Sequence, residues 1–534
     1  MTPIKPFRRL KKKPIKIEEI VANNDNEMGM DKGILDYPFE NVRAEVESAF
    51  GMSADLRVLE GRTADKDVLI FYLETMVNSK SLHETISKFL SPNHIFIDNL
   101  ETVDELTSYC KEIFGGASYQ MISTTNEIYS AIINGSLVIS INHLDKAISV
   151  NMLTDEKRSV TEPSSQTVVR GPKDGFIESI STNVSLIRRR IRNQNLHFEQ
   201  YTIGEATQTP VYIGFVKGIV NEAILQEVRN RIKKIKVSAI FESGNIEELI
   251  IDKTFTLFPL ALNTERPDTV AANLMEGKIV ILIDGTPFAL LVPAVFVNFF
   301  EMAEDYYQSF FLGSFVRLIR YLSFMIALLT PSLYVGVLTY HHELLPTTLL
   351  LSVIAQREGV PFPAVVEVLI MEITFEILRE AGVRMPRVIG QMVSIVGALV
   401  IGQAAAEAGI ISNIMIIIVS ITAIANFVSP VYSFAAASRL LRFMLIIFAA
   451  VLGLYGVLLI LVAMVAHLSS LRSFGVPYLA PIAPFIIEDQ KDVFLRFPFW
   501  KMKQRPKYLR AESEQKVFSS SPPSPPPMKG GNSS

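Results

Sequence analysis

The apolar positions of this 534-residue chain are unevenly distributed. As far as about residue 311, charged residues are frequent and apolar runs are short. From about Phe315 to Leu468, several apolar runs are long enough to cross a bilayer, which takes roughly 20 residues. The pattern therefore predicts a soluble N-terminal region of mixed helices and strands, α+β or α/β, followed by an all-α polytopic membrane domain.

The start of the soluble region is predicted to be a flexible basic arm, residues 1–35, followed by a first α/β subdomain, residues 36–153. Strand-like runs occur at Val68–Leu73 and Ser136–Ile141. Helix-like patterns occur at Ser81–Leu90 and Thr102–Ile113.

A polar stretch with two prolines, Thr154–Gly175, begins the second α/β subdomain, which is expected to span residues 154–311. Its most distinctive segment is Lys278–Pro293, where two β-rich runs flank Asp284-Gly285. Asp-Gly tolerates the positive φ that a type I′ turn needs, so a β-hairpin is predicted. The same turn residues argue against a transmembrane helix at this position.

The transmembrane helical domain is expected over residues 312–488. Its clear predicted spans are Phe315–Tyr340, Val388–Ile411, Ile414–Ala437 and Phe443–His467. The shorter segments Leu344–Ala355 and Pro361–Ala381 are interpreted as re-entrant or interfacial helices, with a tilted pair of spans as the alternative. Three prolines in Phe474–Ile487 predict another broken or re-entrant element. A cytoplasmic tail over 489–534 is expected to be disordered from about residue 511.

Basic residues indicate how the chain is oriented. They cluster before the first and second spans, in the tail, and at Arg439 and Arg442 between the third and fourth spans. The positive-inside rule places those positions in the cytoplasm. The basic start of the chain lacks the apolar core of a signal peptide, so the N-terminal region is also expected there. The basic arm could contact anionic lipid, or it could be a solvated tail.

Composition agrees with a membrane protein and suggests no enzyme. Hydrophobic residues make up 49% of the chain, and the net charge of −3 gives no indication of nucleic-acid binding. The single cysteine, Cys110, cannot form an internal disulfide and fits a reducing compartment. The sequence shows no metal-ligand cluster, P-loop, G-x-S-x-G or GxGxxG in a strand–helix context. No catalytic residue, metal or cofactor is therefore predicted.

Small and polar residues inside the second predicted span are candidate pore-lining positions. They are Gly390, Gln391, Ser394, Gly397, Val400, Ile401, Gln403, Ala404 and Ala408. Small side chains allow helices to pack closely, which is one interpretation. The alternative is a narrow pore wall formed by several copies of this helix, with an apolar gate at Val400 or Ile401.

Glu372, Glu376 and Glu380 lie at helical spacing and form an acidic face. Such a face could attract cations at a pore mouth, or it could be the solvated side of an interfacial helix.

Long ordered runs of residues resemble one known family over roughly residues 40–500. They include Glu162-Pro163, Val169-Arg170-Gly171-Pro172, Thr264-Glu265-Arg266-Pro267-Asp268, Phe375-Glu376-Ile377-Leu378-Arg379-Glu380-Ala381-Gly382-Val383-Arg384, and Gly397-Ala398-Leu399-Val400-Ile401-Gly402-Gln403-Ala404-Ala405. The chain resembles the A subunits of GerA-type spore germination receptors. It departs from the family pattern at Gln166 and Ser238, where acids would be expected.

The resemblance implies a multi-pass protein in the inner membrane of dormant spores, with the soluble region on the spore-core side. Such proteins act with a polytopic, transporter-like B subunit, which is the expected nutrient binder, and a lipoprotein C subunit. The A subunit is expected to self-associate and form a nutrient-gated ion channel whose ion release starts germination. The alternatives are a non-conducting scaffold or signalling subunit and a paralogue that amplifies germination. A secondary transporter ranks last, because no convincing internal repeat is present.

Overall fold

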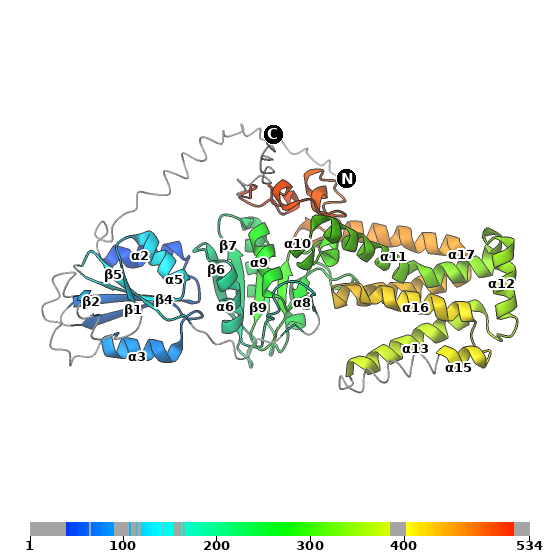
Figure 1. Cartoon of the computed structure of the whole chain (residues 1–534), viewed down its shortest axis with the longest axis horizontal. Helices are drawn as coiled ribbons and strands as arrows, with labels where there is room; N and C mark the ends of the chain where they lie inside the picture. Colours follow the sequence, from blue (N-terminus) through cyan, green and yellow to red (C-terminus); the bar gives the residue numbers. More distant parts are fainter. Residues whose placement is uncertain are drawn as a thin grey trace, which may run out of the picture. The chain divides into compact units, whose positions relative to one another are not determined.

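The computed structural model of the chain describes residues 39–63, 66–89, 106–107, 110, 114, 119–142, 144–153, 162–163, 166–384 and 402–516. The chain forms two compact units (Figure 1). The first unit comprises Met1–Glu156 with Arg192–His197, and the second comprises Lys157–Ile191 with Phe198–Ser534.

The first unit is built on a five-stranded antiparallel sheet in the order β1-β2-β4-β5-β3. Its strands are β1 Leu56–Thr63, β2 Lys66–Leu73, β3 Tyr119–Ile122, β4 Ser136–Ile141 and β5 Ala147–Asn151; its helices are α2 Phe39–Ala49, α3 Ser79–Phe89 and α5 Thr125–Ile133. The two strands expected from the sequence are confirmed. The helix expected at Thr102–Ile113 lies mostly outside the described residues.

Helices cover both faces of this sheet, which explains why all six residues of β4 are buried. Val138 packs in the cluster that contains Val42 of α2 and Ile128 of α5. The next residue, Ile139, packs in the cluster that contains Leu82 of α3. Successive side chains of a strand point to opposite faces, so a fully covered strand is apolar throughout.

The second unit contains another five-stranded sheet, in the order β6-β7-β9-β10-β8. Its strands are β6 Leu196–Ile203, β7 Thr209–Val216, β8 Leu262–Thr264, β9 Ile279–Ile283 and β10 Ala289–Val292; the helices around it are α6 Ile180–Arg190, α7 Glu222–Lys234, α8 Ser243–Ile250, α9 Pro267–Glu276, η3 Phe296–Phe300 and α10 Glu304–Tyr307.

The predicted hairpin is confirmed, since β9 and β10 pair antiparallel with Ile281 opposite Leu290. The turn type was wrong. Gly285 has φ +89°, but Asp284 does not have positive φ, and the connection covers residues 284–288. Asp284 instead accepts a hydrogen bond from the backbone N–H of Ile180, 3.1 Å away, at the start of α6. A tertiary contact therefore shapes this loop.

The remaining helices extend away from the second sheet (Figure 1). They are α11 Phe310–Tyr340, α12 Thr347–Arg357, α13 Ala364–Arg384, α15 Gly402–Glu407, α16 Asn413–Phe427 and α17 Tyr432–Ser470. Within the described residues, α11 and α17 are long and apolar enough to cross a membrane. The first predicted span lies within α11. The second, Val388–Ile411, lies mostly outside the described residues.

The fourth predicted span, Phe443–His467, is not one straight helix. Helix α17 breaks at Gly453, whose φ of 62° and ψ of −146° are a combination that essentially only glycine adopts. The two ends of α17 return to the same loop, because Phe434 packs 6.2 Å from Phe258 and His467 lies 3.0 Å from Thr256. Helix α17 is therefore a hairpin with two arms, each roughly 25–30 Å long at 1.5 Å per residue.

Tyr340 at the end of α11 holds the tip of this hairpin. Its hydroxyl donates to the backbone oxygens of Ala450 and Val451, 3.2 and 2.8 Å away. These carbonyls precede the break at Gly453, where the regular helical hydrogen-bond ladder ends. The sequence suggested a single span because the apolar run continues through the turn.

The third predicted span, Ile414–Ala437, is also interrupted. Helix α16 ends at Phe427 and α17 begins at Tyr432, with Pro430 between them. Proline has no N–H to continue the helical ladder, so a break at this position is expected. Arg439 and Arg442 consequently lie inside α17 and are buried, rather than between two spans.

The segment after α17 packs on the second sheet. Phe474, Val476 and Ala480 belong to the core of that sheet, and Ser473 Oγ donates to the backbone oxygen of Leu260 at 2.7 Å. The prediction of a broken or re-entrant membrane element at Phe474–Ile487 is therefore wrong. This segment belongs to the sheet domain. The last long helix ends at Ser470, before the expected domain boundary at 488.

Candidate functional site

Within the described residues of the second unit, two clusters of charged side chains are candidate functional sites. The root network, at the beginning of α11, consists of Asp305, Tyr306, Arg317, Arg320, Asp492 and Arg496. The bundle cluster, between α13 and α17, consists of Glu372, Glu376, Arg379, Arg439 and Arg442.

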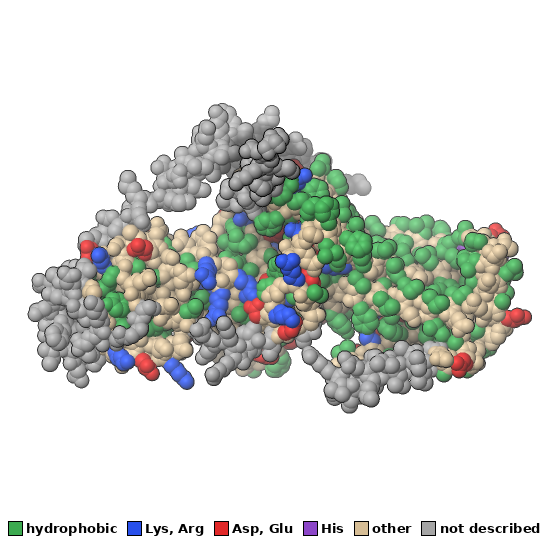
Figure 2. All heavy atoms as spheres, in the orientation of Figure 1, with side chains coloured by type: hydrophobic (Ala, Val, Ile, Leu, Met, Phe, Trp, Pro, Cys, Tyr) green, Lys and Arg blue, Asp and Glu red, His purple; other side chains and the backbone are tan. Residues whose placement is uncertain are grey.

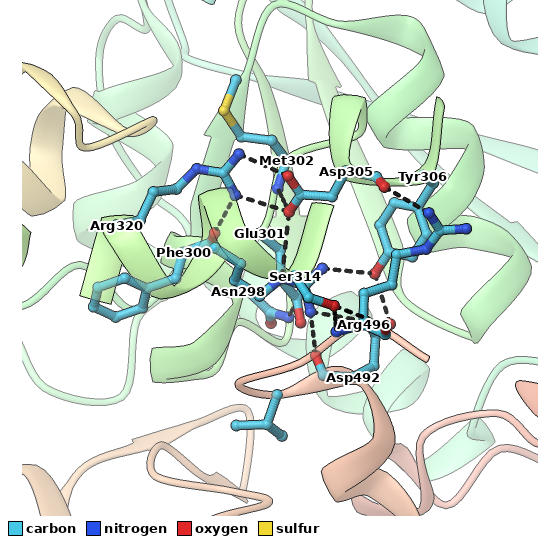
Figure 3. A network of polar contacts seen from close by, with 12 residues as sticks. Asn298, Phe300, Glu301, Met302, Asp305, Tyr306, Ser314, Arg320, Asp492 and Arg496 are labelled. Carbon is cyan, nitrogen blue, oxygen red and sulfur yellow. Dashed lines mark hydrogen bonds and ion pairs between the residues drawn. The ribbon is translucent and has the colours of Figure 1, made fainter. Parts of the chain in front are cut away.

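Asp305 is the centre of the root network (Figure 3). The two terminal guanidinium nitrogens of Arg320 donate to the two carboxylate oxygens of Asp305 at 2.7 and 2.8 Å. Arg317 Nε donates to Oδ2 of the same carboxylate at 3.3 Å. Arg317 and Arg320 are three residues apart, so they project from the same face of α11. All three side chains are buried. Asp305 and Arg320 thus form a bidentate ion pair that joins α10 to α11.

The C-terminal segment completes the root network. Arg317 Nη1 donates to Oδ1 of Asp492 at 2.8 Å, and the Tyr306 hydroxyl donates to Oδ2 at 2.6 Å. Arg496 Nη1 donates to the backbone oxygens of Asp305 and Gln308 at 2.8 and 3.0 Å. Residues up to 191 positions apart in the sequence therefore meet at the beginning of α11.

The network continues toward the sheet through Glu301. Asn298 donates to Glu301 Oε2 at 2.9 Å and accepts from Lys278 Nζ at 2.8 Å. Burial raises the pKa of Glu301 to about 7 and lowers the pKa of Lys278. Burial also raises the pKa of Asp492. Glu301 additionally lines a cavity of about 490 Å³ between α9 and the C-terminal segment.

An aromatic cluster lies beside the root network. Phe434 of α17 stacks on Phe299 of η3 at 5.1 Å and on Phe324 of α11 at 5.2 Å. Phe300 stacks on Tyr321 at 4.1 Å. Ring pairs at these separations attract one another beyond the area they bury. The sheet domain and the long helices are therefore joined by both polar and apolar contacts.

The bundle cluster has the same chemistry with poorer hydrogen bonding. Arg442 Nη2 lies 3.1 Å from Glu372 Oε2, and both side chains are almost fully buried. Arg439 Nε lies 3.5 Å from Glu376 Oε1, and Arg379 also pairs with Glu376. Both oxygens of Glu372 and two nitrogens of Arg442 have no hydrogen-bond partner among the described residues. The cluster pairs two acids with three arginines, but among the described residues much of its hydrogen-bonding capacity is not used.

The structure separates the three acids predicted as one ion-attracting face. Glu372 and Glu376 face the arginines of α17, whereas Glu380 is exposed and pairs with Arg384 at 2.7 Å. The predicted pore-lining residues Gly390, Gln391, Ser394, Gly397, Val400 and Ile401 lie outside the described residues. Gln403, Ala404 and Ala408 are described and exposed, and Gln403 donates to Glu407.

Two further buried carboxylates, Glu367 and Asp305, are not recognisable from the local sequence pattern. Glu367 accepts a hydrogen bond from the backbone N–H of Ser412, 2.6 Å away, and thus holds the N-terminus of α16. Asp305 is hard to predict for the same reason, because the basic pattern around its partner Arg320 indicates only membrane orientation. The spacing of Arg317 and Arg320 on one helix face was the available signal.

The two segments of the soluble region that carry the family resemblance, around residue 170 and around residue 266, contact each other. Arg266 forms a bidentate pair with Asp268, with the closer contact at 2.6 Å, and donates to the backbone oxygen of Pro172 at 3.1 Å. Tyr307 donates to Asp268 at 2.6 Å. Gln166 accepts from the Thr264 hydroxyl at 2.7 Å. These contacts attach the polar stretch around residue 170 to α9 and α10.

Comparisons with known proteins give a consistent result. The family model described as "Bacillus/Clostridium GerA spore germination protein" matches residues 44–508. The chain is 44% identical over 490 residues to spore germination protein KA of Bacillus subtilis, covering 91% of this chain and 89% of that protein. It is 43% identical over 390 residues to spore germination protein GerLA of Bacillus cereus, covering 73% and 79% of the two chains.

A solved structure is also similar. It is the crystal structure of the N-terminal domain of the A subunit of the Bacillus megaterium spore germinant receptor GerK3, with 30% sequence identity. The match covers 48% of this chain and 96% of that chain, with a TM-score of 0.39.

Proposed function

Because this chain belongs to the GerA family of spore germination proteins, we propose that it is the A subunit of a nutrient-responsive germination receptor and that it oligomerises into a nutrient-gated ion channel. In this proposal it crosses the inner spore membrane several times, with the soluble region on the core side. It acts with a transporter-like B subunit and a lipoprotein C subunit. Ions released through the channel start germination.

The observation that carries the proposal is the bundle cluster. Ionisable residues inside an apolar helical region are costly, and they usually mark an ion or water pathway. Glu372 and Arg442 are buried between α13 and α17, and the described residues use the hydrogen-bonding capacity of both side chains incompletely. Such groups favour a second arrangement in which water or ions reach them.

The root network supports the coupling that a gated channel needs. A nutrient can shift a gate only as far as its affinity differs between the closed and open states. That difference has to reach the helices through contacts with the rest of the receptor. The buried ion pairs from Asp305 to Arg317 and Arg320 attach α11 to α10 and are contacts of this kind.

A non-conducting scaffold subunit is the second candidate. The observation that favours it is the pairing of Glu372 and Glu376 with Arg442 and Arg439, which neutralises the predicted cation-attracting face. In that case the ion pathway belongs to another subunit.

The channel is tested with Val400→Ala and Ile401→Ala, which would widen the predicted apolar gate. The variants are expressed in growing cells, and membrane potential and cation leak are recorded against the unmodified chain. Leu399→Ala is the matched control on the opposite face of the predicted helix. A leak in the two gate variants alone supports a gated pore. Normal expression and assembly without a leak favours the scaffold.

A further inference from the structure

Exposed apolar side chains gather where α11 begins and the C-terminal segment passes beside it. Their exposed fractions lie between 39% and 73%, and they are Phe311, Phe315, Phe494, Leu495, Phe499 and Trp500. We call them the aromatic patch. The two segments are adjacent, because Ser314 Oγ donates to the backbone oxygen of Arg496 at 3.0 Å. Figure 2 shows hydrophobic side chains concentrated over this part of the molecule. Exposed apolar side chains in such number on neighbouring segments mark an interaction site.

The aromatic patch lies at the level where the long apolar helices begin. The ring of Phe494 is 5.1 Å from that of Tyr321. Tyr321 precedes Phe324 by three residues, or about 4.5 Å along the helix axis. Phe324 packs against Phe434, at the start of the first arm of α17. If α11 and α17 cross a bilayer, Phe494 therefore lies in its interfacial layer, and Phe315 and Phe311 lie about 14 and 20 Å before Phe324 along α11, toward the headgroups.

A separate element exposes an aromatic ring beside the other end of α17. Phe255, in the loop after α8, is 93% exposed. The next residue, Thr256, contacts His467 near the end of the second arm at 3.0 Å. Aromatic side chains are enriched at membrane–water interfaces, where an apolar ring meets polar headgroups. Two independent elements thus show the same feature at the same ends of the helices.

The charges around the aromatic patch favour an anionic partner. Lys491, Lys501 and Lys503 are exposed and form no ion pair within the described residues. The ammonium group of Lys501 lies 5.1 Å from the centre of the Trp500 ring. Among the neighbouring acids, Glu488 pairs with Lys507 and Asp492 belongs to the root network, whereas Asp489 accepts bonds only from the backbone N–H groups of Lys507 and Tyr508. In residues 488–503, three lysines without an ion pair therefore outnumber the one acid without an ion pair, Asp489, and the uncompensated charge is positive.

We propose that the aromatic patch is an in-plane membrane anchor that inserts into the interfacial layer of an anionic bilayer, with the three lysines binding lipid phosphates. The proposal rests on the proposed function only in requiring that α11 and α17 span the membrane. It does not require the chain to conduct ions. Continuity with the apolar face of α11 and the uncompensated lysines favour lipid over a second copy of the chain.

The chain contains one tryptophan, Trp500, which is an intrinsic probe of the proposed anchor. The full chain is placed in nanodiscs of phosphatidylcholine, with or without phosphatidylglycerol. Trp500 emission, its quenching by lipid brominated near the headgroup end of the acyl chains, and its quenching by aqueous acrylamide are measured. We expect blue-shifted emission, protection from acrylamide and about two-fold stronger bromolipid quenching in the anionic discs.

Charge reversal tests the lysines. Lys501→Glu with Lys503→Glu should abolish the difference between anionic and neutral discs. The matched control is Lys80→Glu with Lys88→Glu, the same charge change on exposed positions of α3 in the first unit. The control should behave like the unmodified chain. The key measurement itself needs no variant, so misfolding of a variant does not affect it.

Two outcomes would overturn the anchor. Free access of acrylamide to Trp500, without bromolipid quenching, would show that the patch is in water. Protection from both quenchers would show that protein covers it, and loss of that protection at one chain per disc would identify a second copy. Failure of the proposed channel would appear differently, as absent ion flux with Trp500 still quenched by lipid.

Discussion

The root network and the bundle cluster use the same side chains but differ in how completely these are hydrogen-bonded. Both carboxylate oxygens of Asp305 accept bonds from Arg317 or Arg320. By contrast, neither oxygen of Glu372 has a hydrogen-bond partner among the described residues, although Arg442 is 3.1 Å away. A buried charge is tolerated when partners satisfy it, and an unsatisfied one favours rearrangement. The difference indicates a fixed joint at the root and an adjustable contact in the bundle.

The largest effect is expected from Asp305→Ala. Removing this carboxylate leaves Arg317 and Arg320 buried without their shared partner, which should cost roughly 3–5 kcal/mol. Thermal unfolding of the full chain in detergent measures the loss. Asp305→Asn retains the shape and should be intermediate. A variant as stable as the unmodified chain would mean that the root network is not a joint.

The bundle cluster should respond differently to removal of a whole pair. Glu372→Leu alone leaves Arg442 buried and should destabilise by about 3 kcal/mol. Glu372→Leu combined with Arg442→Leu should recover most of that loss, because apolar replacement of a poorly bonded buried pair is often neutral or stabilising. The corresponding double change at Asp305 and Arg320 should not recover, since it also takes the Asp305 carboxylate away from the buried Arg317. Equal recovery at both sites would remove the distinction.

Glu301 gives the root network a predictable dependence on pH. Its pKa is raised to about 7 in the folded chain, above its ordinary value of 4.5, so the folded state holds this proton more tightly. Its contribution to stability is therefore complete at low pH and is lost as pH rises from about 4.5 through 7. Glu301→Gln should flatten that fall, by about 1–3 kcal/mol. Unfolding followed from pH 5 to 8 tests this, and an unchanged slope in the variant would contradict it.

The smallest expected effect concerns Ser314. Its hydroxyl donates to the backbone oxygen of Arg496 and accepts from its N–H, each at 3.0 Å. Ser314→Ala should cost about 1 kcal/mol, the usual value of a hydrogen bond. Ser469→Ala, at an exposed hydroxyl of α17 that bonds within its own helix, is the control and should be nearly neutral. Equal losses would show that Ser314 adds nothing specific to the root network.

Local sequence patterns predicted those helices and strands whose burial can be inferred from their own residues. β4 was recognisable because a strand covered on both faces is apolar throughout. The β9–β10 hairpin was recognisable from Asp284-Gly285, although the N-terminus of α6 decides the shape of its loop. Helix α11 was recognisable from its length of apolar sequence.

The helical hairpin and the charge clusters could not be predicted in the same way. An apolar run looks the same whether it is straight or folded at Gly453, because hydropathy carries no information on backbone angles. Arg439 and Arg442 resembled the basic flanks of a loop, since their partners lie on α13, some 65 residues earlier in the chain. The pore-lining positions around Ile401 remain a prediction.

The sequence by itself determined the division into a sheet-containing region and an apolar helical region, the main strands, and the family. Each follows from contiguous patterns of side chains. Only the tertiary structure decided that α17 folds back on itself, that the segment after Ser470 returns to the second sheet, and that Asp305 meets Arg317 and Arg320 beside Asp492. Those contacts join residues distant in sequence, and their energies depend on burial that only the folded chain creates.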